Sequence, residues 1–130
     1  MITTRISKGK IMKLVISSEG PNPTDRVDPR FGRARYLILF DSNSAAFVAH
    51  DNAALADAVQ GAGVQAAQYV VDLGADVLLT GHCGPKAFDV LATAGVRIHS
   101  GFEGTVMGAV RALQSGKLES LTSPDGVGRH

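Results

Sequence analysis

The stretch GADVLLTGHCGP, residues Gly74–Pro85, decides the fold class of this 130-residue chain. Its centre, Asp76–Thr80, is too short and too apolar for a surface helix and is typical of a strand buried on both faces. The glycines that follow, together with Pro85, predict a sharp turn into a helix, because proline fits the first helical turn. A buried strand that leads directly into a helix is the repeating step of an α/β protein.

The same step recurs through the second half of the chain. A run with apolar residues at helical spacing precedes this stretch and ends at Gly74, which predicts a helix with a glycine cap. Crossovers of this kind produce parallel strands with right-handed connections. After the turn, the pattern predicts a helix from Pro85 to Gly95, a strand at Val96 to His99 and a third helix from Gly104 to Gly116.

The first half predicts three more strands. Lys13 to Ser17 is a short β-branched run, ended by a segment rich in Gly and Pro. Tyr36 to Asp41 and Ala45 to Ala49 flank a polar turn, which indicates an antiparallel hairpin. The chain is therefore expected to form one α/β sheet with the hairpin at an antiparallel edge.

Composition narrows the class of protein. A hydrophobic fraction of 45% is enough for the core of one domain, expected at residues 12–120, between a disordered leader at 1–11 and a flexible tail at 121–130. A single cysteine cannot form an internal disulfide, and no stretch reads as a signal peptide or membrane span, so we expect a cytoplasmic protein without membrane contact. The net charge of +1 depends on a basic leader, and the chain has no Trp, which argues against nucleic-acid binding.

Ligands of open parallel sheets bind where strands end and helices begin. Three segments, 17–20, 80–85 and 100–105, are expected to converge there. Free N–H groups at Gly84–Lys86 and at Gly104, Thr105 and Val106 would each favour an anion by about 0.5 to 1 kcal/mol.

A long loop, residues 18–35, contributes the candidate cationic residues. Arg30, Phe31, Gly32 and Arg33 place two guanidinium groups around an aromatic ring and a glycine, which suits a multiply charged anion. The alternative is that both arginines are solvated or pair with Asp25 and Asp28.

Cys83 and His82 leave several interpretations open. Cys83 is either a small buried hydrophobe or a metal ligand, whose thiol pKa a helix N-terminus and Lys86 would lower. His82 is a second ligand, an outer hydrogen-bonding partner or a solvent-facing residue, whereas His99 is expected near the crevice and His50 at the surface. No CxxC or HxxxH motif indicates a metal cage made by protein side chains alone, so the cargo would bring its own inorganic framework.

Several motifs, taken in order, resemble the dinitrogenase iron-molybdenum cofactor biosynthesis family, and within it the orange-protein type of sulfate-reducing bacteria. They span about residues 12–120 and include Pro29-Arg30-Phe31-Gly32-Arg33-Ala34, residues 74–81, Gly84-Pro85 and Gly104-Thr105-Val106. The resemblance implies a three-layer ribonuclease H-like fold whose five-stranded mixed sheet has the order 3-2-1-4-5. It also implies non-enzymatic handling of a metal-sulfur cluster, such as a sulfide-bridged molybdenum-copper cluster held non-covalently.

Two positions depart from the family pattern. Many relatives carry histidine where this chain has Arg30, and many carry an aliphatic residue where it has Cys83. The leading hypothesis is a carrier of an anionic molybdenum-copper sulfide cluster or an iron-molybdenum cofactor precursor. Cys83 would be the metal ligand, Arg30, Phe31, Gly32, Arg33, His82, Gly84, Gly104 and Thr105 would surround the cluster, and a protein partner would receive it. The alternatives are a regulatory or interaction module and a thiol-dependent enzyme.

Overall fold

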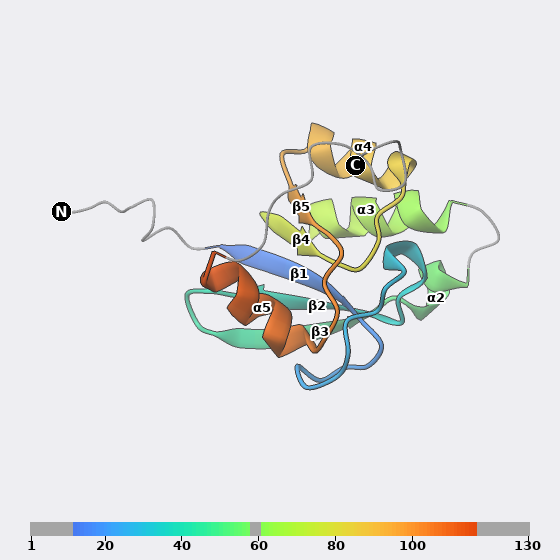
Figure 1. Ribbon diagram of the computed structural model, residues 1–130. Coiled ribbons are helices and arrows are strands. Elements are labelled where there is room, and N and C mark those ends of the chain that lie inside the picture. Colours follow the sequence, from blue (N-terminus) through green and yellow to red (C-terminus); the bar gives the residue numbers. More distant parts are fainter. Residues whose placement is uncertain (1–11, 58–60, 117–130) are drawn as a thin grey trace.

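Five strands form one mixed sheet at the centre of the molecule, in the order β3-β2-β1-β4-β5 (Figure 1). The computed structural model describes residues 12–57 and 61–116. β1 pairs with β2 in antiparallel and with β4 in parallel orientation, while β3 is antiparallel to β2 and β5 is parallel to β4. This confirms the predicted mixed sheet and its order. The strands are β1 (Lys13–Ser18), β2 (Tyr36–Asp41), β3 (Ala46–Asp51), β4 (Val77–Leu79) and β5 (Arg97–His99).

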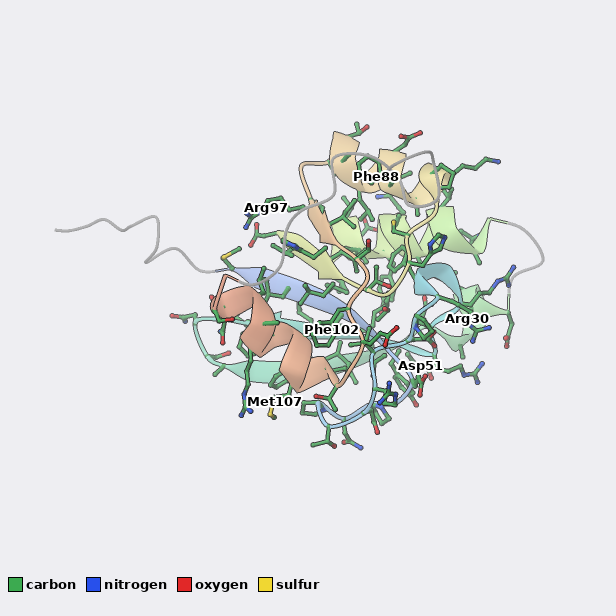
Figure 2. All side chains as sticks on the ribbon, viewed as in Figure 1. Arg30, Asp51, Phe88, Arg97, Phe102 and Met107 are labelled. Carbon is green, nitrogen blue, oxygen red and sulfur yellow. The ribbon has the colours of Figure 1, made fainter. Side chains whose placement is uncertain are left out.

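Helices cover both faces of the sheet and make three layers (Figure 1). Successive side chains of a strand point to opposite faces, so Val15 packs in the cluster under α3 and α4, whereas Leu14 and Ile16 pack in the cluster under α5. Phe88 joins the first of these clusters and Phe102 the second (Figure 2). The helices are α2 (Ala53–Ala56), α3 (Ala62–Asp72), α4 (Pro85–Thr93) and α5 (Val106–Gln114), with the 3-10 helix η2 (Phe31–Arg33) between β1 and β2.

The sequence predicted α3, α4 and α5 but neither α2 nor η2. Both missed elements are single turns, of four and three residues, and are too short to show a helical repeat of apolar positions. The glycines predicted to end the three long helices do follow them, each with a left-handed φ between 77° and 83°. The repeat of apolar residues was therefore sufficient to predict the long helices but not the single helical turns.

The predictions for the termini lie partly outside the described residues. The sheet and its helices fall within residues 12–116, inside the predicted domain of 12–120. The predicted leader at 1–11 and tail at 121–130 are not among the described residues. None of the described helices is long and apolar enough to cross a membrane.

Candidate functional site

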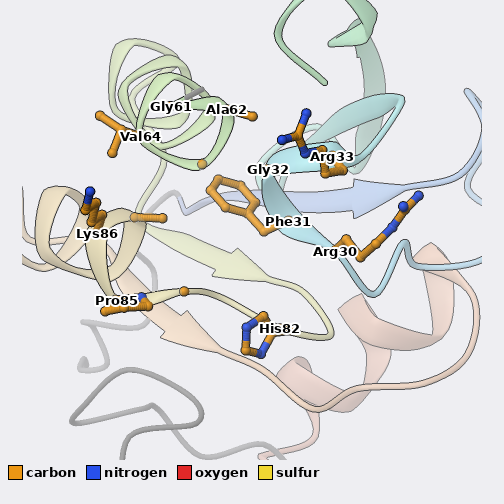
Figure 3. A pocket seen from close by; sticks show the side chains of 13 residues that line it. Arg30, Phe31, Gly32, Arg33, Gly61, Ala62, Val64, His82, Pro85 and Lys86 are labelled. Carbon is orange, nitrogen blue, oxygen red and sulfur yellow. The ribbon is translucent and has the colours of Figure 1, made fainter. Parts of the chain in front are cut away.

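An open cavity of about 470 Å³ lies beside η2, where the N-termini of α3 and α4 meet (Figure 3). It is located at the carboxyl end of the parallel strands, on the face of the sheet that α3 and α4 cover. The cavity therefore occupies the edge at which the sequence predicted a ligand. It is lined by Arg30, Phe31, Gly32, Arg33, Gly61, Ala62, Gly63, Val64, His82, Gly84, Pro85, Lys86 and Ala87.

Buried hydroxyl groups fix the start of the loop that carries η2. Ser17 Oγ donates to the carbonyl oxygen of Asp28 at 2.8 Å and lies 2.7 Å from Thr80 Oγ1. The Asp28 N–H in turn donates to the Ser17 carbonyl at 2.9 Å. All three residues are buried, so these bonds form in a region of low dielectric constant, where they are strongest. The loop is thus held to the ends of β1 and β4.

Two close backbone approaches press the same loop against its neighbours. A Cβ atom on Gly81 would lie 2.6 Å from Pro29 Cα, and one on Gly32 would lie 2.7 Å from Gly63 Cα. Only glycine allows backbone segments to come this near. Gly81 and Gly32 therefore determine how closely η2 lies to the β4–α4 turn and to α3.

The N-terminus of α4 opens onto the cavity without a side-chain cap. Gly84 is the N-cap residue, Pro85 occupies the first turn, and no acidic residue stands in that turn. The N–H groups of Lys86 and Ala87 find no acceptor among the described residues. They retain the partial positive charge of a helix N-terminus.

The N-terminus of α3 opens onto the same cavity, which the sequence analysis did not predict. Gly61 caps it with a left-handed φ of 73° and no side chain, and its first turn also lacks an acid. Gly61, Ala62, Gly63 and Val64 all line the cavity. The available signal was the run of small residues before the helical repeat, although such a run is also typical of a tight turn.

The charged side chains around the cavity are all cationic. Arg30, Arg33 and Lys86 line it, and none of the lining residues is acidic. Arg33 Nη1 donates to the Ala56 carbonyl at 2.8 Å, which ties it to α2. Arg30 extends away from the centre of the cavity (Figure 3), and its Nε lies 3.7 Å from Asp28 Oδ1. The predicted alternative, a pairing of Arg30 with Asp28, is thus present in part.

His82 stands at the rim and is exposed (Figure 3). Its carbonyl accepts from the Phe31 N–H at 3.3 Å, and its backbone forms an isolated parallel bridge with Arg30. The ring is therefore brought to the cavity by a short ladder between the β4–α4 turn and η2. The structure shows an exposed His82 side chain that could also contact a ligand from the side of the cavity.

Cys83, next to His82 in the chain, turns the other way. Its side chain is fully buried and packs in the core with Phe31, Ala87 and Leu91, and its Sγ lies 3.8 Å from the Gly84 carbonyl oxygen. It does not line the cavity. A sulfur that binds a metal must be able to reach it, and the buried Cys83 Sγ does not reach the cavity. The structure therefore favours the interpretation of Cys83 as a small core residue. Direct ligation by Cys83 stays a prediction without structural support.

We expect the variant Cys83→Ala to keep its affinity for cargo within about twofold while its free energy of unfolding falls by about 1 kcal/mol, because a buried sulfur is lost. Binding titrations and urea unfolding of the two proteins measure both quantities. A large loss of affinity with unchanged stability would restore the thiolate as a ligand.

The structure corrects the prediction that the N-terminus of α5 offers free N–H donors to a ligand. The Val106 N–H donates to the Asp25 carbonyl and the Met107 N–H to the Pro23 carbonyl, at 2.9 and 2.8 Å. Thr105 Oγ1 accepts from the Gly108 N–H at 3.0 Å as the helix cap. Gly104 and Thr105 do not line the cavity. The long loop after β1 thus takes the Val106 N–H, so the prediction that this group is free for a ligand is wrong, and neither of the other two predicted donors, Gly104 and Thr105, lines the cavity.

The remaining histidines also lie away from the cavity. His99 is buried and lines a different hollow, beside Met12 and Leu113. His50, expected at the surface, is half-buried in β3, with Nδ1 3.3 Å from the Tyr69 hydroxyl. Within residues 12–57 and 61–116, no group of three His, Cys, Asp or Glu side chains is placed to hold a metal ion.

Fold and cavity together define a small three-layer α/β protein with a cationic, carboxylate-free hollow at the carboxyl edge of its parallel strands. The chain belongs to the dinitrogenase iron-molybdenum cofactor family, whose model matches residues 12–116. The family resemblance inferred from the motifs is thereby confirmed.

Similar structures agree with this assignment. The apo form of the orange protein from Desulfovibrio gigas is 38% identical, superimposes with a TM-score of 0.86, and the match covers 89% of this chain and 98% of that one. A NifB-like protein from Thermotoga is 35% identical over 86% of this chain and 95% of its own, with a TM-score of 0.76. An uncharacterized protein from Methanocaldococcus jannaschii is 24% identical over 91% of this chain and 98% of its own length. The matched family is named for the iron-molybdenum cofactor of dinitrogenase.

Proposed function

We propose that the protein binds and carries an anionic metal-sulfur cluster in the cavity between η2, α3 and α4, without enzymatic turnover. The cargo is a molybdenum-copper sulfide cluster, and the alternative cargo is an iron-molybdenum cofactor precursor. The observation that supports this is the lining itself, in which two helix N-termini without side-chain caps meet two arginines and a lysine and no carboxylate.

The forces available suit a complete anion better than a bare metal ion. Each helix terminus favours an anion by about 0.5 to 1 kcal/mol, and Arg30, Arg33 and Lys86 add charge around it. Bare metal cations need several side-chain ligands, and the described residues contain no group of three His, Cys, Asp or Glu side chains that could hold one. A cluster whose metals are already bridged by sulfide needs only contacts to its outer atoms.

The apolar part of the lining supports a sulfur-rich cargo. Ala62, Val64, Pro85 and Ala87 stand among the cationic groups, and the Phe31 ring lies between α3 and the β4–α4 turn (Figure 3). Sulfide is larger and softer than oxide and is suited to apolar surroundings. We place this binding in the cytoplasm, where the cargo would pass to a protein partner.

Metal analysis and visible absorption of natively purified protein test the proposal. We expect molybdenum and copper, or iron and molybdenum for the alternative cargo, and a charge-transfer band in the visible range. Apoprotein should regain the band on addition of tetrathiomolybdate and copper at a fixed stoichiometry. Substoichiometric metal together with failed reconstitution would contradict the proposal and favour a module that binds a small anion or a partner.

A further inference from the structure

Asp28 is the only acidic residue that is buried among the described residues, with 3% of its surface exposed. Its backbone is fixed by the two hydrogen bonds to Ser17 described above. Burial of a carboxylate is unfavourable unless hydrogen bonds or a cation compensate for it. The side chain of Asp28 therefore needs partners, and it stands beside the cavity.

Both partners come from Arg30. Asp28 Oδ1 accepts the Arg30 backbone N–H at 2.9 Å and lies 3.7 Å from Arg30 Nε. The two side chains differ in exposure, because that of Asp28 is 4% exposed and that of Arg30 is 70% exposed. A buried anion thus stands opposite a cation that solvent or a ligand can reach.

The direction in which the Arg30 side chain extends links its contact with Asp28 to the binding of cargo. Arg30 lines the cavity, yet its side chain extends away from it, on the side opposite Lys86 (Figure 3). A cluster with several negative charges would attract the guanidinium more strongly than one carboxylate does. Asp28 and cargo therefore compete for the same cation.

We propose that Asp28 holds Arg30 in a resting position from which the cargo withdraws it, so that Asp28 lowers cargo affinity and favours release. This role rests on the proposed function. Asp28 acts through Arg30 and is a positioning residue, since its own side chain does not line the cavity. The contact reforms as cargo leaves, which stabilises the empty state at the moment of transfer.

The variant Asp28→Asn isolates the charge, because asparagine keeps an oxygen that can accept the Arg30 N–H. We expect it to bind tetrathiomolybdate with copper about two- to fivefold more tightly than the parent, the range of one partly exposed ion pair. In an Arg30→Gln background, the same change at Asp28 should alter affinity less than twofold. Spectroscopic titration of the four proteins completes this double-mutant cycle.

Two results would overturn the role of Asp28 while leaving the proposed function intact. One is equal or weaker binding by Asp28→Asn, the outcome if Asp28 orients Arg30 toward cargo. The other is an undiminished gain in the Arg30→Gln background, the outcome if Asp28 acts only as a general negative charge. Absence of binding by the parent and by Asp28→Asn would instead overturn the proposed function.

A second measurement does not depend on the folding of a variant. The Arg30 Nε–H resonance of the intact chain, assigned by NMR, should shift when tetrathiomolybdate and copper are added, because the guanidinium leaves Asp28. A resonance that stays in place while the amides of Lys86 and Ala87 shift would show that cargo binds without withdrawing Arg30, and would overturn the inference.

Discussion

Replacing Arg30, Arg33 and Lys86 together with glutamine should lower the affinity for a molybdenum-copper sulfide cluster roughly 100-fold at low salt. Each lining cation is expected to contribute about 1 kcal/mol to the binding of a multiply charged anion, and three such contributions correspond to about two powers of ten. Titration of the visible band at several salt concentrations measures the loss. The parent should weaken steeply as salt screens these charges, whereas the variant should depend on salt far less.

A matched control removes the same amount of charge elsewhere. Arg26, Arg97 and Arg111 are exposed and do not line the cavity, and Arg97 lies at the opposite end of the sheet from Arg30 (Figure 2). Their combined replacement by glutamine should lower affinity only a few-fold, through the change in net charge. Equal losses in the two triple variants would show that net charge, not the cavity, attracts the cargo.

The variants Gly81→Ala and Gly32→Ala should each lower the free energy of unfolding by about 1 to 3 kcal/mol, the usual cost of forcing a methyl group into a closed contact. The new Cβ would meet backbone at 2.6 Å from Pro29 and 2.7 Å from Gly63, so a side-chain rotation cannot relieve the clash. The loop must shift, and Phe31 and Arg33 shift with it, so affinity should fall as well. Urea unfolding and cluster titration measure the two effects.

Gly63→Ala is the control for this prediction, because it adds a methyl group to the other side of the Gly32 contact. There the new Cβ would lie 3.7 Å from the Ala87 Cβ, an ordinary van der Waals distance, and the position is helical. Alanine should therefore keep or raise stability. If Gly32→Ala proved as stable as Gly63→Ala, the loop would not depend on the close approach.

The elements that the sequence predicted are those whose signal is local. Val77–Leu79 reads as a buried strand, and Pro85 with Gly95 brackets a helix, because strand burial and helix ends depend on neighbouring residues. The strand order came with the family resemblance, and two of its motifs, residues 29–34 and Gly84-Pro85, lie on the loop and the turn that shape the cavity. The rule that ligands bind where parallel strands end predicted that Arg30, Arg33, His82 and Gly84 would gather, and the structure brings them around one cavity.

The parts that the sequence could not predict depend on contacts between distant segments. The donors of α5 are taken by the carbonyls of Pro23 and Asp25, and nothing near Thr105 indicates this. The direction of Cys83 is set by the core it enters, so its neighbours in sequence suggested a site that its side chain does not reach. The start of α3 offers only backbone groups, and its run of small residues is equally typical of a tight turn.

The N–H donors of the helix N-termini are distributed unevenly over the two faces of the sheet. Two helix N-termini, those of α3 and α4, face the cavity, while the loop after β1 accepts hydrogen bonds from the N-terminus of α5. An anion bound here would therefore be held from one face of the sheet only. The loop that closes α5 also carries Asp28 and Arg30, so the same segment shapes the binding face and positions one of its cations.

The central claim is that an anionic cluster binds at the N-termini of α3 and α4. Amide chemical shifts of the intact chain, followed during addition of tetrathiomolybdate and copper, test it most directly. The account predicts the largest changes at Gly63, Val64, Lys86 and Ala87, with Val106 and Met107 nearly unchanged. Changes concentrated at Val106 and Met107, with the starts of α3 and α4 unaffected, would contradict it.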